Sequence, residues 1–242
     1  MRDYKQEFES RTAFLRGLIE SSGAAGFVYG NSGGKDSALV GILCKAACEN
    51  TVGILMPCAS KRNFGEDTDD GLEVARQFRI ETRTADLTAV REAELGVLSG
   101  ITKINDAARA NIAPRLRMTT LYSVAASENL LVVGTGNRSE AYMGYFTKWG
   151  DGAYDCNPIS DLTVTEIYEF LRYLDAPASI IQKAPSAGLF EGQTDEAEMG
   201  VTYAAIDHFL FTGEASEHDR AVIEGYHRRS EHKRMPAAVY KK

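Results

Sequence analysis

Four short apolar runs divide the chain at regular intervals and predict β-strands. They are Ala25–Tyr29, Thr51–Met56, the alternating segment Arg79–Ala85 and Leu130–Val133. Glycine, asparagine or proline bounds most of these runs, which is typical of strand ends.

Helical periodicity fills the segments between and after the strands. An amphipathic helix is predicted for Asp3–Ser21, and a second follows the first strand, with Leu39, Val40, Leu43 and Ala47 on one face. Further helical patterns cover these ranges: 67–78, the segment after Asp86, 111–126, 161–174, 202–211 and 216–229. Strands that alternate with helices indicate an α/β fold with a doubly wound parallel sheet flanked by helices. Ligands of such sheets bind beyond the carboxyl ends of the strands.

A glycine-rich segment, Gly30-Asn31-Ser32-Gly33-Gly34-Lys35-Asp36-Ser37, lies at such a carboxyl end and opens a helix. The first turn of a helix offers free N–H groups and the positive end of its dipole, so an anion fits there, most often a phosphate. The segment is not a Walker A loop, because Asp36 follows Gly34-Lys35 and Tyr29 fills the first glycine position. A carboxylate beside a phosphate requires a cation between them, which predicts Mg²⁺. The alternative is an exposed turn in which Asp36 only complements the helix dipole.

A second glycine-bearing turn, Gly134–Glu140, leaves the fourth strand at the same edge of the sheet. Glu140 is a candidate second carboxylate opposite Asp36, and Thr135 is a candidate nucleotide contact. The next segment, Gly144–Asp155, is rich in glycine and aromatic residues and suits a binding loop.

Three other segments carry candidate binding residues. Arg115 and Arg117 lie two residues apart at the start of a predicted helix and point to different faces, so each is either an anion ligand or a surface ion-pair partner. Lys183–Glu196 is a long loop and a candidate lid over bound nucleotide. The basic run Ser230–Pro236 would ordinarily be a solvated tail.

Composition narrows the functional classes. The chain has 242 residues, of which 44% are apolar, enough for a sizeable core, and a net charge of −7, which argues against a broad nucleic-acid surface. The four cysteines form no C-x-x-C pair and suit a reducing cytoplasm. We expect a cytoplasmic protein that binds neither nucleic acid nor membrane, since neither a signal peptide nor a membrane-spanning run is evident.

The segment Ser32–Ser37 resembles the SGGxDS loop of the ATP pyrophosphatases. This resemblance implies an adenine nucleotide alpha hydrolase-like, Rossmann-like fold and a loop that grips the pyrophosphate of ATP. That superfamily includes NAD synthetases, GMP synthetases, asparagine synthetases and tRNA-modifying enzymes, and the loop alone does not choose among them.

Four further segments together resemble the ammonia-dependent NAD synthetases: 111–118, 134–155, 185–196 and 231–234. The resemblance implies one NAD synthetase domain over residues 1–242, with a helical C-terminal part. It implies amidation of deamido-NAD in two steps, through an adenylylated intermediate with release of pyrophosphate and then AMP. No nucleophilic side chain is required, and no convincing Ser-His-Asp or Cys-His set is present.

Site residues carry over from this resemblance position by position. Gly30–Ser37 would hold the ATP phosphates, Thr135 and Ser186 would contact ATP, and Asp36 and Glu140 would bind Mg²⁺. Contacts to deamido-NAD would come from five residues: Arg115, Lys148, Asp155, His232 and Lys233. Two positions depart from the pattern: Asn31 replaces a common apolar residue, and Val164 stands where many relatives have an ATP-contacting lysine. The resemblance also implies a homodimer, with the 111–126 region and the tail near the interface.

Other functions remain open from the sequence. A glutamine-using enzyme needs an additional amidase domain, so ammonia is either free or supplied by a separate subunit. A GMP synthetase would lack the 183–196 segment in this form, and a tRNA-modifying enzyme would bring a basic domain or suitable cysteines. A non-catalytic nucleotide-binding protein would not need both Asp36 and Glu140.

Overall fold

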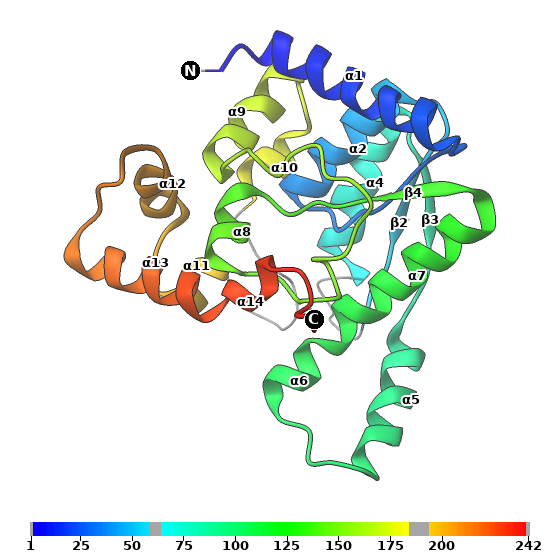
Figure 1. The fold of residues 1–242 in the computed structure, drawn as a ribbon. Helices are drawn as coiled ribbons and strands as arrows, with labels where there is room; N and C mark the ends of the chain where they lie inside the picture. Colours follow the sequence, from blue (N-terminus) through cyan, green and yellow to red (C-terminus); the bar gives the residue numbers. More distant parts are fainter. Residues whose placement is uncertain (1, 59–63, 184–193, 241–242) are drawn as a thin grey trace.

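The strands form one parallel sheet in the order β3-β2-β1-β4 in the computed structural model, which describes residues 2–58, 64–183 and 194–240 (Figure 1). The strand bounds are Gly26–Gly30 (β1), Thr51–Leu55 (β2), Glu81–Thr84 (β3) and Leu130–Val133 (β4). In the register, Phe27 lies opposite Thr51, Gly26 opposite Leu130, and Val52 opposite Glu81. The chain winds outward from β1 through β2 to β3 and then returns to the other side of β1 as β4. The doubly wound parallel sheet predicted from the sequence is confirmed.

Helices connect the strands and form the C-terminal part of the chain. Those of the sheet region are α1 (Tyr4–Ser22), α2 (Lys35–Ala47), α4 (Glu66–Phe78), α5 (Thr88–Ser99), α6 (Asp106–Ala110) and α7 (Ile112–Glu128). Those that follow β4 are α8 (Arg138–Met143), α9 (Val164–Tyr173), α10 (Ala178–Gln182), α11 (Asp195–Met199), α12 (Tyr203–Thr212), α13 (Glu217–Arg229) and α14 (Glu231–Arg234). Within the described ranges, none of the helices combines the length and apolar character needed to cross a bilayer.

Alternate residues of β1 enter different cores, because successive side chains of a strand point to opposite faces. Phe27 and Tyr29 pack with residues of α1, α2, α4 and α9 on one face. Val28 packs with residues of β2, β4 and α7 on the other. The apolar face predicted for α2 is confirmed, since Leu39, Val40 and Leu43 belong to the first core.

A third apolar cluster holds the C-terminal helices together. It joins Met143 of α8 and Val164 of α9 to residues of α12 and α13, among them Tyr203 and Ile223. Side-chain caps fix where these helices begin: Thr163 caps α9 in a capping box, and Thr202 and Ser216 cap α12 and α13.

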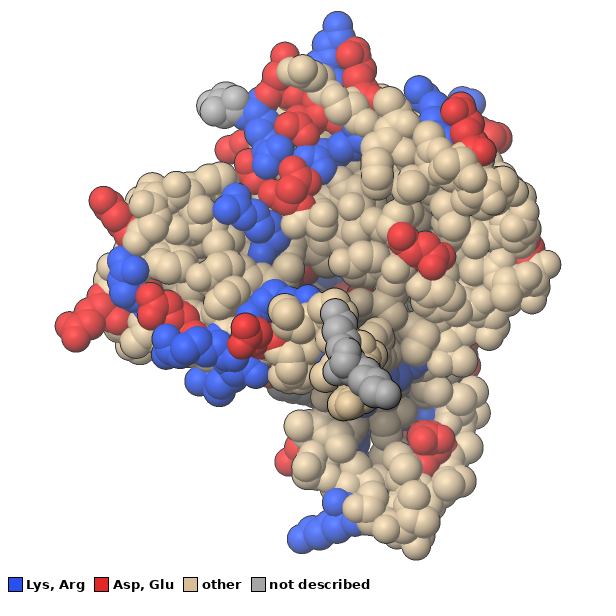
Figure 2. All heavy atoms as spheres, viewed as in Figure 1, with Lys and Arg blue, Asp and Glu red and all other residues tan. Residues whose placement is uncertain are grey.

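One local expectation from the sequence is wrong. Asp195 and Glu196 were expected in the long loop but begin α11; the rest of that loop, apart from Lys183 and Thr194, lies outside the described residues. For the basic run after α13, the structure excludes the alternative of a simple solvated tail, because the run contains the short helix α14 and its Ser230 is buried and bonded to Met143. Figure 2 shows Lys and Arg side chains gathered over α13 and α14.

The first testable prediction concerns Tyr29, which is 0% exposed and whose hydroxyl has no hydrogen-bond partner among the described residues. Its ring packs against Gly41 and Gly53, where a Cβ at either position would clash with the tyrosine side chain. A buried unpaired hydroxyl costs free energy, so Tyr29→Phe should raise the free energy of unfolding by about 1 kcal/mol. Urea denaturation measures this, with Tyr173→Phe, at a 51% exposed position, as the control. A less stable Tyr29→Phe protein would show that the hydroxyl has a partner.

Candidate functional site

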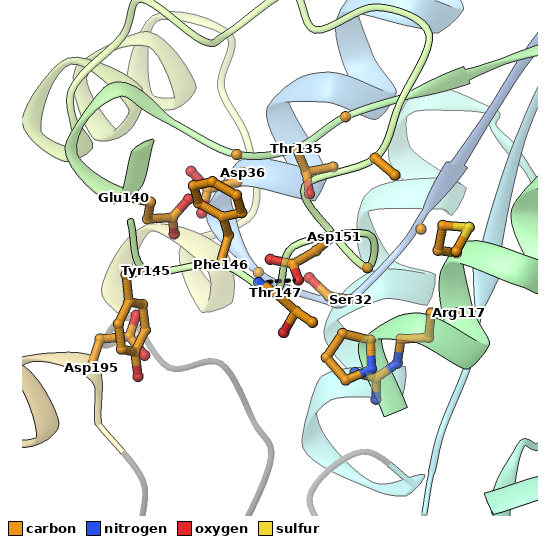
Figure 3. A pocket seen from close by; sticks show the side chains of 18 of the residues that line it. Ser32, Asp36, Arg117, Thr135, Glu140, Tyr145, Phe146, Thr147, Asp151 and Asp195 are labelled. Carbon is orange, nitrogen blue, oxygen red and sulfur yellow. Dashed lines mark hydrogen bonds between the residues drawn. The ribbon is translucent and has the colours of Figure 1, made fainter. Parts of the chain in front are cut away.

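A cavity of about 610 Å³ opens at the carboxyl ends of β1 and β4, where the winding of the sheet reverses (Figure 3). Its walls come from the loop after β1, the end of β2, the turn after β4 and helices α7 and α8. Parallel sheets bind their ligands at such a reversal. The two glycine-bearing turns found in the sequence, at Gly30–Gly34 and Gly134–Gly136, both contribute to this cavity.

The loop after β1 is held rigidly against α4. Gly33 has a φ of +68°, and a Cβ at this position would lie 1.9 Å from the carbonyl oxygen of Asp67, so only glycine fits. The side chain of Asn31 donates to the Gly71 carbonyl at 3.0 Å and accepts from the Gly33 N–H at 3.3 Å. The unexpected Asn31 therefore has a structural role, which is to fasten the loop to α4.

Helix α2 begins with no side-chain cap, because its N-cap residue is Gly34. Its first N–H groups and the positive end of its dipole are therefore available to a ligand in the cavity. The hydroxyl groups of Ser32 and Ser37 lie 3.1 Å apart at the same turn. This is the geometry of a phosphate site.

Two carboxylates, Asp36 of α2 and Glu140 of α8, lie near each other on one wall of the cavity (Figure 3). Asp36 accepts from the Lys35 ammonium at 2.8 Å and from the Asn137 side-chain amide at 3.0 Å. Glu140 accepts from the Asn137 backbone N–H at 3.0 Å. Its desolvation and the nearby Asp36 charge raise the pKa of Glu140 well above its usual value, although Lys35 opposes this shift.

This pair of carboxylates fits a divalent cation that also binds phosphate. Carboxylate oxygens are the ligands that Mg²⁺ prefers, and Mg²⁺ in nucleotide sites takes one or two of them and completes its shell with phosphate and water. The described part of the chain contains no cluster of three or more His, Cys, Asp or Glu suited to a metal. A cation held by Asp36 and Glu140 would therefore depend on the nucleotide for further ligands.

The other predicted site residues divide into two groups. Thr135 and Lys233 line the cavity, whereas Ser186 lies outside the described residues. Lys233 donates to the carbonyl groups of Gly144 and Phe146 at 2.8 and 2.7 Å, and burial lowers the pKa of its ammonium group.

The remaining four predicted dinucleotide contacts are not among the residues that line the cavity. Lys148 donates to the His232 carbonyl at 2.7 Å, and its own carbonyl accepts a weak bond from Arg115 at 3.4 Å. Asp155 accepts from the Tyr122 hydroxyl and from the Val132 N–H. Arg115, Lys148 and His232 thus form one connected patch beside the cavity, while Asp155 lies apart from it, against β4 and α7.

Three polar residues that lie at the cavity wall or fix its carboxylates were not predicted from the sequence. Arg117 was considered only with Arg115 and was not chosen; it lines the cavity and donates to the Met56 carbonyl at 3.1 Å. Lys183 forms ion pairs with Asp67 and Asp70 at 2.8 and 2.5 Å. Asn137 contacts both carboxylates. The helical periodicity of α7 could have indicated that Arg117 and Arg115 lie on different faces of the helix. No local sequence pattern indicates the distant partners of Lys183 or Asn137.

Comparison with known proteins identifies the family of this chain. The family model for NAD synthase matches residues 7–241. This chain belongs to the NAD synthase family. One relative is the NH₃-dependent NAD⁺ synthetase of Carboxydothermus hydrogenoformans. It is 46% identical to this chain over 235 residues, which is 96% of each chain. The family resemblance drawn from the sequence is confirmed.

Solved structures of the family have the same fold. The NMN synthetase from Francisella tularensis superposes with a TM-score of 0.94 at 38% identity, over 100% of both chains. The NH₃-dependent NAD synthetase from Campylobacter jejuni, solved with a nitrate ion, superposes with a TM-score of 0.80 at 28% identity, also over 100% of both chains.

The second prediction tests the charge balance of the carboxylate pair. Lys35 is 6% exposed, bonds to Asp36 and lies over the ring of Tyr203. Lys35→Met keeps the apolar stem but leaves the carboxylates without their internal cation, so we expect the metal-free protein to lose about 1–3 kcal/mol of stability. Added Mg²⁺ should restore part of this loss.

Thermal unfolding with and without millimolar Mg²⁺ measures both effects. Lys45→Met is the matched control, because Lys45 lies on the same helix as Lys35 and pairs with the exposed Glu49 just beyond the helix end, so its loss should cost under about 1 kcal/mol. If Lys35→Met unfolds like the unaltered protein in both conditions, Lys35 does not balance the pair.

Proposed function

We propose that this NAD synthase family member is an ammonia-dependent NAD⁺ synthetase, a ligase of NAD biosynthesis that amidates deamido-NAD. The observation that carries the proposal is the uncapped N-terminus of α2 beside the Asp36–Glu140 pair, at the reversal point of the sheet. The relatives that match nearly the whole chain bear the same activity in their names.

The chemistry follows from the substrate. A carboxylate does not exchange oxide for ammonia, so the nicotinate oxygen first attacks the α-phosphorus of ATP and the bond to pyrophosphate breaks. Ammonia then attacks the activated carbonyl carbon, AMP leaves with the former carboxylate oxygen, and a proton is released. Negative charge develops on phosphate oxygens in the first step, and fixed N–H groups and cations stabilise it.

Each part of the site has a proposed role in that sequence. The Gly30–Ser37 loop and the first N–H groups of α2 bind the phosphates of ATP, and Lys35 adds positive charge beside them. Asp36 and Glu140 would hold Mg²⁺, which would offset phosphate charge. Thr135 and Ser186 contact the nucleotide. No side chain forms a covalent intermediate.

The nicotinate-containing substrate takes the other end of the cavity. Lys233 and Arg117 both line the cavity, and we assign them the positive charge that offsets the phosphate groups of this substrate. The patch of Arg115, Lys148 and His232 lies beside the cavity, and Asp155 accepts from Tyr122 farther along α7. We assign the second nucleotide half of a dinucleotide to this surface. The exposed Trp149 adjoins that patch along the chain. We propose a homodimer that covers this surface.

We also propose that residues 1–242 act as one domain and that the protein works in the cytoplasm. The family model spans residues 7–241, and the four cysteines are free, as expected in a reducing compartment. Free ammonia, or ammonia from a separate subunit, is the nitrogen source.

A second candidate is an NMN synthetase that amidates the mononucleotide. Two observations favour it. The NMN synthetase structure superposes with a TM-score of 0.94, against 0.80 for the NAD synthetase from Campylobacter jejuni. The described cavity also omits most of the residues expected to contact the dinucleotide. Both reactions use the same ATP chemistry and differ in the size of the acceptor.

The third prediction separates these candidates. With ATP, Mg²⁺ and ¹⁵N-ammonium, we expect kcat/KM for deamido-NAD to exceed that for nicotinate mononucleotide by at least about tenfold, roughly 1.4 kcal/mol of transition-state binding. Chromatography of NAD, NMN and AMP measures this, with xanthosine monophosphate as the control acceptor. A preference for the mononucleotide supports the second candidate, and turnover of xanthosine monophosphate alone contradicts both.

The fourth prediction concerns Lys233. Loss of one charged ligand contact costs about 1.5–3 kcal/mol, so Lys233→Ala should raise the KM for deamido-NAD roughly ten- to a hundredfold and leave the KM for ATP nearly unchanged. Steady-state kinetics measure both constants. Arg228→Ala on the neighbouring α13 is the control, since its side chain is 71% exposed. Unaltered deamido-NAD kinetics in Lys233→Ala would limit Lys233 to holding the Gly144 and Phe146 carbonyls.

A further inference from the structure

Asn137 is fully buried and bonds to both carboxylates of the site. Its side-chain amide nitrogen donates to Asp36 Oδ1 at 3.0 Å. Its backbone N–H donates to Glu140 Oε2 at 3.0 Å, and its own Oδ1 accepts from the Glu140 N–H at 2.9 Å. One residue therefore contacts the side chain of Asp36 and both the side chain and backbone of Glu140.

Helix capping explains only part of this arrangement. Asn137 and Glu140 form a capping box at the start of α8, but serine, threonine or aspartate would supply the same cap oxygen. Thr163 and Glu166 form such a box at α9 without an amide. The amide nitrogen of Asn137 is a donor that no cap requires, and the structure directs it at Asp36.

The additional bond from Asn137 holds the Asp36 and Glu140 carboxylates close together, although their charges repel each other. Asp36 and Glu140 are like charges close together, and each would gain by turning away from the other. Asn137 holds one oxygen of each carboxylate, while Lys35 holds the second oxygen of Asp36. Each carboxylate oxygen has two acceptor positions, so acceptor positions remain for a cation in the cavity.

We propose that Asn137 is a positioning residue that sets the separation and orientation of the Asp36 and Glu140 carboxylates for a divalent cation. It does not touch substrate or metal, and it acts by holding the two ligands in place before the cation arrives. The inference rests on the proposed role of Asp36 and Glu140 as the cation ligands.

Asn137→Ser separates this role from capping, because serine caps α8 but is too short to reach Asp36. The probe is Mg²⁺ titrated in the presence of saturating α,β-methylene-ATP, with the rise in unfolding temperature as the readout. We expect the Mg²⁺ concentration for half of the rise to increase about tenfold, because loss of a residue that orients metal ligands typically weakens metal binding by at least this much. Asn105→Ser is the matched control: Asn105 caps α6 through the same side-chain oxygen, and its titration should match that of the unaltered protein.

Turnover provides a second readout. Asn137→Ser should regain most of its kcat at high Mg²⁺, which a folding defect would not allow. A Mg²⁺ titration of Asn137→Ser equal to that of the unaltered protein would overturn the proposal. Asp36→Asn and Glu140→Gln distinguish the two levels: if these also titrate normally, the metal assignment fails, whereas if they lose the response and Asn137→Ser keeps it, only the positioning role fails.

A measurement on unaltered Asn137 decides the matter if the serine variant does not fold. In Asp36→Ala, the proposal expects the side-chain amide proton of Asn137 to shift upfield and exchange faster with water, as seen by ¹⁵N NMR. An amide signal that is unaffected by loss of Asp36 would overturn it.

Discussion

The repulsion between Asp36 and Glu140 is the constraint that the rest of the site satisfies. Two carboxylates stay together in a partly enclosed cavity only if cations and donors offset their charge. Lys35 supplies the cation and Asn137 supplies the donors. The sheet makes the meeting possible, because β1 and β4 are neighbours and each ends in a turn that starts the helix carrying one of these carboxylates.

Features that depend on residues close together in the sequence could be predicted from it. The strands, the glycine-bearing turn after β1 and the apolar face of α2 follow from patterns within a few residues, and the structure contains them. The pairing of Asp36 with Glu140 was also within reach, because both follow strands of one parallel sheet at the same edge. By contrast, the bond from Asn137 to Asp36 spans 101 positions and that from Lys183 to Asp67 spans 116, so no local pattern marks them.

For Arg115 and Arg117, the family resemblance and the structure select different residues. Residues two apart on a helix point in different directions, so only one can line the cavity wall formed by α7. The structure turns Arg117 inward and leaves Arg115 exposed beside Lys148. The predicted contact of Arg115 with the dinucleotide therefore requires a substrate that extends beyond the cavity. A dinucleotide is long enough for such a contact to be useful, so Arg115 bears on whether the acceptor is a mononucleotide or a dinucleotide.

Val164 raises a related question about where the site obtains positive charge. The family resemblance places an ATP-contacting lysine at this position, but Val164 is buried in the apolar cluster that also contains Tyr203. The ammonium group of Lys35 lies over the ring of that same tyrosine, 5.6 Å from its centroid. Burial lowers the pKa of Lys35, but Asp36 and Glu140 more than offset this, so the group stays charged. The glycine-bearing loop after β1 thus leads into a residue, Lys35, whose ammonium group lies beside the apolar cluster that contains Val164.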